Sequence, residues 1–429
     1  MTVEYHLPGI HVTELLVRVP LDWNAVGAAA GAEIDLLVRE LVAPDRKNDE
    51  LPLLLYLEGG PGGASPRPLG RSGWIDEALE HYRVVLIDQR GTGRSNPLEG
   101  ADFIRLDAET GADFLSFFRA DSIIRDVEHV RRTRYGGRQW AILGQSYGGF
   151  LALTYLSTAP AGLSACYICG GIPGVPPSAD EVYRRTFTRA RRRSEEFYRR
   201  FPDDLELVEA IADRLADGPV HLPDGDILTV RRFQSLGLAF GMGPGLARMH
   251  WLFERALVTQ SRLSTHFLER VMVETSSAED PLFWTLQENI YADAGGGPTA
   301  WAAERRRDSH PEFGEERRPL LFTAEMAFPW MFDEIRLLRP FRDAVHALAA
   351  RSGWPALYDE DALAANEVPL AAAVYFDDLY VDSGLQLDTL GRIGGARAWV
   401  TNEFEHDGIS SGRVLTRLRE LVRDSGGER

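Results

Sequence analysis

The sequence predicts an α/β protein with a mostly parallel central sheet that is interrupted by a large helical segment. Three observations support this fold class. Short apolar runs that end in glycine-rich turns and lead into helical patterns recur between residues 50 and 175. A long, mostly helical stretch follows them, and two further apolar runs return near the carboxyl end. This order is typical of a sheet domain that carries an inserted helical domain.

The elements are predicted in chain order. Near the start, residues 10–20 and 33–41 favour an antiparallel pair at the edge of the sheet. The buried strands that follow are predicted at residues 51–57, 83–87, 140–143 and 165–169. The helical patterns between these strands cover residues 121–134 and 149–158.

One stretch of this region, residues 139–179, contains no charged residue and is long enough to raise the question of a membrane span. Its prolines and glycines would interrupt such a helix repeatedly. A parallel sheet is buried on both faces, so its strands need no polar alternation. We therefore interpret the stretch as the buried centre of the sheet together with one of its helices.

The pattern changes after residue 172. We assign residues 173–335 to a helical domain, and residues 1–172 and 336–429 to the sheet domain. Within the helical domain, residues 184–201 are dense in arginine, which we interpret as a solvated helix face. The elements predicted beyond it are a helix at 341–350, strands at 369–376 and 397–401, and a final helix at 411–421.

Composition and charge exclude several classes of protein. The chain has 429 residues, of which 44% are hydrophobic and 26% charged, so it can form a large core beneath a solvated surface. Its formal net charge of −17 disfavours a nucleic-acid partner, which requires a basic surface. It has two cysteines, too few for a disulfide framework, and its amino terminus lacks the pattern of a signal peptide. We therefore expect a cytoplasmic protein without a membrane partner.

The pentapeptide Gly144-Gln145-Ser146-Tyr147-Gly148 has the Gly-x-Ser-x-Gly pattern. A predicted strand precedes it and the start of a helix follows. This context places the serine on a tight turn with its hydroxyl projecting from the sheet. Glycines flank the serine because larger side chains would collide with the neighbouring strand and helix. We predict Ser146 to be a catalytic nucleophile.

A nucleophilic serine needs a base, and the base needs an orienting acid, in the chain order Ser, Asp or Glu, His. After Ser146, only His406 lies in a loop beyond a late strand, and we predict it to be the base. The remaining histidines after the nucleophile, which we interpret as surface or packing residues, are His221, His250, His266, His310 and His346.

The acid should follow the strand that ends near residue 376, where Asp377, Asp378 and Asp382 compete. We prefer Asp378, because one helix and one strand fit between it and His406. Asp377 would point to the opposite side of an extended strand end, and Asp382 lies past the expected turn.

Acyl transfer also requires donors for a developing oxyanion. One is expected from the backbone N–H of Tyr147, the residue after the nucleophile. The other should come from the glycine-rich loop 59–63, and we assign it to Gly60. This loop lacks the Lys-Ser/Thr pair of a P-loop and the dinucleotide-binding spacing, so a phosphate-binding role is disfavoured.

Cys166 and Cys169 have the spacing of a redox or metal motif. They lie within a predicted buried strand and have no other ligand types nearby in the sequence. Free cysteines are among the most commonly buried residues, so we interpret both as core residues and predict no metal site.

Three segments of the chain carry a family resemblance. Residues 58–63 (EGGPGG) resemble a His-Gly-Gly-Pro-Gly loop, with Glu58 where shorter members carry histidine. Residues 88–95 (DQRGTGRS) are similar to an Asp-Gln-Arg-Gly-x-Gly-x-Ser segment, and residues 144–149 match a nucleophile elbow. The family with these segments is the proline iminopeptidases, or prolyl aminopeptidases, of the α/β-hydrolase fold. The resemblance implies that the helical domain is a cap, and that the protein is a serine exopeptidase that releases N-terminal proline from small peptides without a metal or other cofactor.

The resemblance also implies carboxylates in the cap that bind the protonated amine of the substrate. Glu288, in the segment 287–291 (QENIY), resembles a Glu-Asn-x-Tyr segment of the family's cap. Glu325 is a lone carboxylate in an uncharged stretch, so its burial would require a ligand or an arginine partner. A structural ion pair is the alternative for each glutamate. The aromatic residues that would enclose the proline ring, or else pack in the core, are Tyr291, Phe322, Phe328 and Trp330.

Two other functions fit the same residues. An esterase, an amidase or a broader aminopeptidase of the same fold would turn over acyl esters without depending on a charged amine. A non-catalytic binding protein on the same scaffold would not need Ser146, Asp378 and His406 together.

Overall fold

In the computed structural model, which describes residues 2–25, 31–259 and 262–427, nine strands form one central sheet in the order β1-β2-β3-β5-β4-β6-β7-β10-β11. The amino-terminal edge is antiparallel, and its strands are β1 (Thr2–Leu7), β2 (Ile10–Pro20) and β3 (Glu33–Val42). β3 pairs antiparallel with β5. Strand β1 was not predicted, although Val3, Tyr5 and Leu7 alternate with polar residues; the alternation covers six residues whose side chains are mostly exposed.

The rest of the sheet is parallel. Its strands are β4 (Leu53–Leu57), β5 (Arg83–Ile87), β6 (Trp140–Gln145), β7 (Leu163–Cys169), β10 (Leu370–Tyr375) and β11 (Arg397–Thr401). Parallel neighbours require long crossovers, which helices supply here. The predicted α/β fold class is therefore confirmed, and β7 with β10 spans the largest interruption in sequence.

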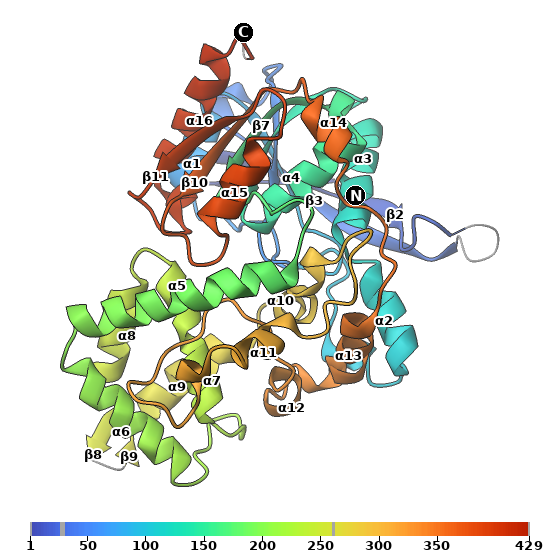
Figure 1. The fold of residues 1–429 in the computed structure, drawn as a ribbon. Coiled ribbons are helices and arrows are strands. Elements are labelled where there is room, and N and C mark those ends of the chain that lie inside the picture. Colours follow the sequence, from blue (N-terminus) through green and yellow to red (C-terminus); the bar gives the residue numbers. More distant parts are fainter. Residues whose placement is uncertain (1, 26–30, 260–261, 428–429) are drawn as a thin grey trace.

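Helices cover both faces of the sheet (Figure 1). One face packs against α1 (Gly73–Leu79) and α16 (Arg413–Asp424), as the stacked rings of Tyr56 and Trp74 illustrate. The other packs against α3 (Ala120–Arg134) and α4 (Tyr147–Thr158). Because neither face of the central strands meets water, β4 is buried along its whole length and reads as a continuous apolar run.

The chain between β7 and β10 is mostly helical. Its helices are α5 (Ala179–Arg200), α6 (Asp204–Ala216), α7 (Val230–Gln234), α8 (Gly245–Glu254), α9 (Thr265–Thr275), α10 (Pro281–Leu286), α11 (Ala302–Arg307), α12 (Met331–Glu334), α13 (Arg342–Ala350) and α14 (Glu360–Ala364). A short hairpin, β8 (Leu257–Thr259) with β9 (Arg262–Leu263), and a 3₁₀ segment, η5 (Ser235–Gly241), lie among them. Within the described part of the chain, no helix combines the length and the apolar character of a membrane span.

Helix α5 lies between the sheet domain and the helices α6, α8 and α9 (Figure 1). Ser178 caps its amino-terminal end, because the Ser178 hydroxyl accepts the backbone N–H of Glu181. Its apolar stripe of Tyr183, Phe187 and Phe197 is buried, so one side of the helix is committed to packing. Helix α2 (Ala108–Ser116) packs against α13, and α15 (Ser383–Leu390) joins β10 to β11.

Candidate active site

Ser146 lies on the tight turn between β6 and α4, with φ 54° and ψ −124°. A non-glycine residue rarely adopts such a backbone conformation unless its surroundings impose it. They do so here, because a Cβ on Gly148 would lie 2.0 Å from the carbonyl oxygen of Leu57, and one on Gly149 would lie 2.2 Å from that of Gly171. The structure thus has the strand-turn-helix geometry that the pentapeptide predicts.

Asp378 and His406 meet at the carboxyl end of the neighbouring strands. Asp378 follows β10 and is fully buried, and its Oδ2 lies 2.8 Å from Nδ1 of His406. Its Oδ1 accepts the backbone N–H groups of Tyr380 at 2.8 Å and Val381 at 3.1 Å. One carboxylate oxygen is therefore held by the backbone, and the other faces the histidine.

His406 lies in the loop after β11 and is 4% exposed. Burial lowers the pKa of its imidazole, but the Asp378 carboxylate opposes this strongly enough to leave the pKa above its ordinary value. Its Nε2 is buried and has no hydrogen-bond partner among the described residues. In the neutral imidazole, a ring nitrogen without a partner can take the proton of a hydroxyl as that hydroxyl attacks a substrate.

The serine turn and the Asp378–His406 pair share one end of the sheet. The side-chain amide of Gln145 donates to the carbonyl oxygen of His406 at 3.0 Å, and the N–H of Ser146 donates to the carbonyl oxygen of Cys169 at 3.0 Å. A Cβ on Gly170 would lie 3.2 Å from Oδ2 of Asp378. These contacts bring the three predicted catalytic residues into one region.

The competing aspartates have other surroundings. Asp377 is exposed. Asp382 forms ion pairs with Arg185 and Arg189, and its carboxylate also accepts the N–H of Leu385 at the start of α15. Of the three, only Asp378 contacts His406, which favours the preference drawn from chain order.

The glycine-rich loop lies against the nucleophile. A Cβ on Gly59 would lie 3.2 Å from the Cβ of Ser146, and Gly60 has a φ of 110° that other residues rarely adopt. On the other side of the site, Tyr147 begins α4, where the first N–H groups have no partner within the helix. The loop that carries Gly60 and the start of α4 therefore both border Ser146.

Glu288 is 6% exposed, and both of its carboxylate oxygens have partners. Oε1 accepts the N–H of Trp301 and Oε2 that of Ala302, each at 2.7 Å. These donors begin α11, so the carboxylate stabilises the amino-terminal end of that helix. Burial raises the pKa of Glu288, although the Thr299 hydroxyl and the two N–H groups favour its ionised form.

Glu325 is half-buried and forms no ion pair with any described residue. Burial raises its pKa to about 7, while the positive charge of His406 acts in the opposite direction. The charge of Glu325 also acts on Tyr183, Tyr291 and Tyr380, and Gln287 hydrogen-bonds to it. Glu325 is thus a carboxylate without an ion-pair partner among the described residues, close enough to the candidate catalytic pair for its charge to interact with theirs.

The four aromatic candidates divide into two groups. Phe322 packs among the rings of Phe233 and Phe253 in the helical core, and Phe328 stacks on Trp330 with ring centroids 6.1 Å apart. Tyr291, in contrast, lies 6.0 Å from the ring of Phe150 on α4 and 6.3 Å from that of Tyr183. Tyr291 is the one of the four that these contacts bring close to the serine turn.

Comparison with known proteins identifies the family. A family model described as alpha/beta hydrolase fold matches residues 52–210. A proline iminopeptidase from Aeromonas sobria is 41% identical over 425 residues, which cover 98% of this chain and 99% of that protein. One from Aspergillus aculeatus is 34% identical over 390 residues, 87% of this chain and 86% of its own length. This chain belongs to the proline iminopeptidase family.

A solved structure that resembles this chain is more distant. A crystal structure of a proline iminopeptidase from Mycobacterium smegmatis covers 96% of this chain at 14% identity, with a TM-score of 0.40. The assignment to the proline iminopeptidase family therefore depends on the sequence relatives alone.

Glu58 precedes the glycines, at the position where the resemblance leads us to expect histidine. Its Oε1 accepts the N–H of Gly59 at 2.9 Å, and its carbonyl oxygen accepts the side-chain amide of Gln89 at 3.0 Å. Burial raises the pKa of Glu58 to about 7, and the nearby charge of Asp280 acts in the same direction. The Glu58 side chain thus binds the first glycine of the loop, and its backbone is held by Gln89 in the segment after β5.

Residues 88–95 of this chain hold the segment that follows the glycine-rich loop. Asp88 accepts hydrogen bonds from Ser65 and Arg67, at 2.6 Å to each. Arg90 is fully buried and forms a bidentate pair with Asp126 at 2.6 and 2.7 Å. Breaking such a buried pair from one side costs about 3–5 kcal/mol. The segment that carries the family resemblance thus has a structural role.

Sequence reasoning missed Tyr380. Its ring packs edge-on against that of His406 with centroids 4.7 Å apart, and its hydroxyl donates to the carbonyl oxygen of Leu238. No motif marks it, and the one available signal was an aromatic residue two positions after the preferred acid. Cys166 and Cys169 are buried free thiols, as expected for core residues. The described residues contain no cluster of three or more His, Cys, Asp or Glu side chains that could hold a metal ion.

Proposed function

We propose that this member of the proline iminopeptidase family releases N-terminal proline from small peptides through an acyl-enzyme, with Ser146 as nucleophile, His406 as base and Asp378 as orienting acid. The observation that carries the substrate assignment is Glu325, a half-buried carboxylate that forms no ion pair with a described residue and whose charge acts on His406. A peptide whose amino terminus is a protonated secondary amine supplies the missing cation.

The proposed chemistry has two halves. Oγ of Ser146 attacks the prolyl carbonyl carbon while Nε2 of His406 takes its proton, and the N–H groups of Tyr147 and Gly60 stabilise the oxyanion. His406 then gives the proton to the nitrogen of the departing peptide as the amide bond breaks. Water, deprotonated by His406, attacks the prolyl ester and releases proline and the free Ser146 hydroxyl.

Asp378 acts through His406 in both halves. Its Oδ2 lies 2.8 Å from Nδ1, so it keeps the proton on that nitrogen and leaves Nε2 as the acceptor. It also stabilises the imidazolium that forms when the serine proton is transferred.

The amine site explains why the enzyme would act only at the amino terminus. We propose that Glu325 receives the cation, that Glu288 adds a second negative charge to the same region, and that residues 173–335 form a cap that excludes longer amino-terminal extensions. Support comes from Tyr183, on which the charges of both glutamates act. Tyr291 is the aromatic residue best placed to contact the proline ring.

The first prediction is a change in substrate preference on Glu325→Gln. The substitution is expected to lower kcat/KM for a proline anilide by about 100-fold, because it removes one partner of a buried charge pair. A short, neutral acyl ester should be hydrolysed at the wild-type rate, since the Ser146 machinery remains intact. Steady-state kinetics on the two substrates measure the difference, and an equal loss on both would rule out amine anchoring by Glu325.

Glu288→Gln is the matched variant for this experiment. It should also lower kcat/KM for the proline substrate, but it removes an acceptor from the start of α11 and is therefore expected to lower the melting temperature.

Glu325→Gln should raise the melting temperature at pH 8 and lose this advantage near pH 5. The sign follows from the raised pKa of Glu325. Above the ordinary pKa of a glutamate, the carboxyl ionises less readily in the folded protein than in the unfolded chain, which lowers the free energy of unfolding. Below that pKa both states hold the proton, and the cost disappears.

The second prediction concerns the acidic limb of the pH profile. His406 must be neutral to act as a base, and Glu325, with a pKa of about 7, must be ionised to bind the amine. For a proline anilide, log kcat/KM should therefore rise with a slope approaching two below neutral pH. A neutral ester should show a slope of one, as should the anilide with Glu325→Gln. The two groups interact, so the apparent pKa values belong to the pair.

We also propose that the enzyme works in the cytoplasm on free peptides, with no nucleic-acid partner. This proposal is supported by the formal net charge of −17 and by the two buried thiols, whose pKa values burial raises. Fractionation of the native host with an antibody to the enzyme tests the location.

A further inference from the structure

Three arginines of α5 lie one helical turn apart on the side that faces the sheet domain. Their side chains are 32%, 23% and 13% exposed, and they are Arg185, Arg189 and Arg193. The interpretation of this region as a solvated helix face is therefore wrong for these three, although it holds for Arg184 at 53%. Spacing of four residues brings side chains onto one face of a helix.

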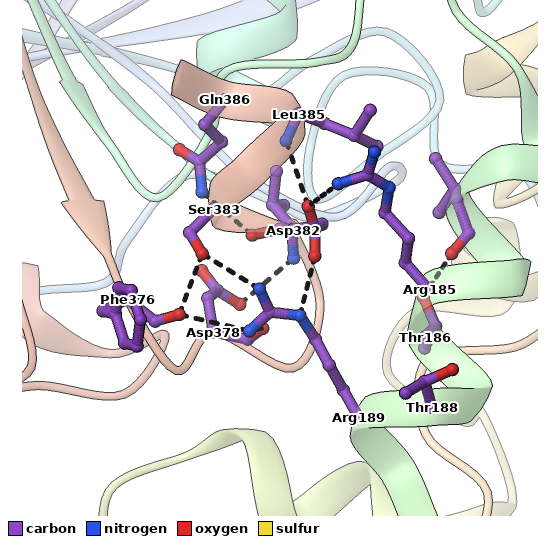
Figure 2. A network of polar contacts seen from close by, with 12 residues as sticks. Arg185, Thr186, Thr188, Arg189, Phe376, Asp378, Asp382, Ser383, Leu385 and Gln386 are labelled. Atoms are coloured by element: carbon purple, nitrogen blue, oxygen red, sulfur yellow. Dashed lines mark hydrogen bonds and ion pairs between the residues drawn. The ribbon is translucent and has the colours of Figure 1, made fainter. Parts of the chain in front are cut away.

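The Arg189 side chain donates hydrogen bonds to several residues of the loop that carries Asp378 (Figure 2). One guanidinium nitrogen, Nη1, donates to the carbonyl oxygens of Phe376 and Asp378, at 3.1 Å each. Nε donates to Oδ2 of Asp382 at 2.7 Å, and Nη2 to Oγ of Ser383 at 2.9 Å. A single side chain of the helical region thus joins both ends of the loop from residue 376 to residue 383.

Arg185 and Ser383 complete this network (Figure 2). Arg185 donates to Oδ1 of Asp382 at 2.8 Å, so the two arginines hold the two oxygens of one carboxylate. The hydroxyl of Ser383 donates to the carbonyl oxygen of Phe376 at 2.9 Å. The loop is therefore closed by side chains around the backbone of Asp378.

Arg193 reaches the loop that carries His406 by two routes. It forms an ion pair with Glu405, the residue immediately before the histidine. Its Nε also donates to the carbonyl oxygen of Phe240 at 3.1 Å, and the next residue, Gly241, accepts the backbone N–H of His406 at 3.0 Å. One face of α5 therefore contacts the loops of both the acid and the base.

We propose that Arg189 and Arg193 are positioning residues that set the geometry of the Asp378–His406 pair from the helical region. The inference depends on the proposed catalytic roles of that pair. The two loops follow different strands, so the 2.8 Å bond between them depends on the position of each loop. A displacement of about 1 Å in such a site can lower the rate about 100-fold. The same face of α5 thereby couples the position of the helical region to the competence of the catalytic pair.

The test compares Arg189→Met and Arg193→Met with Arg192→Met, which removes an exposed arginine of the same helix. Each variant is assayed on a proline anilide and on a short acyl ester. Arg189→Met is expected to lower kcat about 10- to 100-fold on both substrates with KM nearly unchanged. Arg193→Met should lower kcat in the same way, and Arg192→Met should match the wild type.

Two further readouts separate positioning from a general loss of structure. In proton NMR spectra, the downfield signal of the Nδ1 proton shared by His406 and Asp378 should broaden or shift in Arg189→Met and stay unchanged in Arg192→Met. Arg189→Lys should restore activity only in part, because an ammonium cannot reproduce the four contacts of the guanidinium fork. If Arg189→Met does not fold, Ser383→Ala, which removes only one hydroxyl of the network, should lower kcat several-fold on both substrates.

A loss confined to KM for the proline anilide would overturn the inference, since it would mean that Arg189 shapes the amine site instead. So would a fall in melting temperature with unchanged kcat and an unchanged Nδ1 proton signal. Ser146→Ala is included in the same assays: if it retains activity, the proposed function itself is wrong. If it is inactive while Arg189→Met equals Arg192→Met, only the positioning role fails.

Discussion

Replacing Ser146 with alanine is expected to lower kcat on a proline anilide by about 10⁵-fold or more. The loss should be this large because the covalent route disappears, and only binding and oxyanion stabilisation remain. Chromogenic assays measure the rate, and labelling with a phosphonylating reagent reports the nucleophile directly. Neither turnover nor labelling should survive the substitution.

The matched control is Ser164→Ala, which changes an exposed serine of β7. It should keep wild-type activity and label normally. Full turnover by Ser146→Ala would refute the acyl-enzyme mechanism and leave a non-catalytic binding role as the better interpretation of the same fold.

Asp378→Asn is expected to lower kcat by about 10⁴-fold. The reason lies in the backbone around the residue. Two N–H groups, those of Tyr380 and Val381, donate to Oδ1, so the single carbonyl oxygen of an asparagine will turn toward them. Its amide NH₂ then faces Nδ1 of His406, which must become an acceptor, and the proton moves to Nε2. A histidine in that tautomer cannot take the proton of Ser146.

Asp377→Asn provides the comparison for this prediction, because it makes the same exchange of a carboxylate oxygen for an NH₂ group in the exposed neighbour. It should leave kcat within about two-fold of the wild type, as most exposed substitutions do. A larger loss in Asp377→Asn than in Asp378→Asn would mean that the acid has been assigned to the wrong residue. Thermal melting of both variants excludes unfolding as the cause.

Features that depend on a few consecutive residues were predictable from the sequence. The turn at Ser146 is determined by glycines at positions 144, 148 and 149, since a Cβ at any of them would overlap backbone atoms of its neighbours. The parallel strands are likewise visible as apolar runs, because burial on both faces removes any polar alternation. The antiparallel edge strand β1 was missed although its apolar and polar residues alternate, because the alternation is only six residues long and its side chains are mostly exposed.

The surroundings of the glutamates were not predictable in the same way. Glu288 was selected for its motif, yet its two oxygens accept N–H groups of residues 301 and 302. Glu325 was selected because it lacks charged neighbours in the sequence, and it also lacks an ion pair among the described residues. Burial raises the pKa of each glutamate, and the residues next to them in the sequence do not show how deeply each side chain is buried.

By itself, the sequence determined the fold class, the nucleophile turn and the order in which acid and base follow it. These properties are local, because steric exclusion and hydrophobic burial act on neighbouring residues in the chain. Only the tertiary structure decided which of three aspartates meets His406, and which face of an arginine-rich helix turns toward the sheet. Arg189 and Asp382 are 193 residues apart in the chain, and a charge pair over that separation depends on how the helical region packs against the sheet domain.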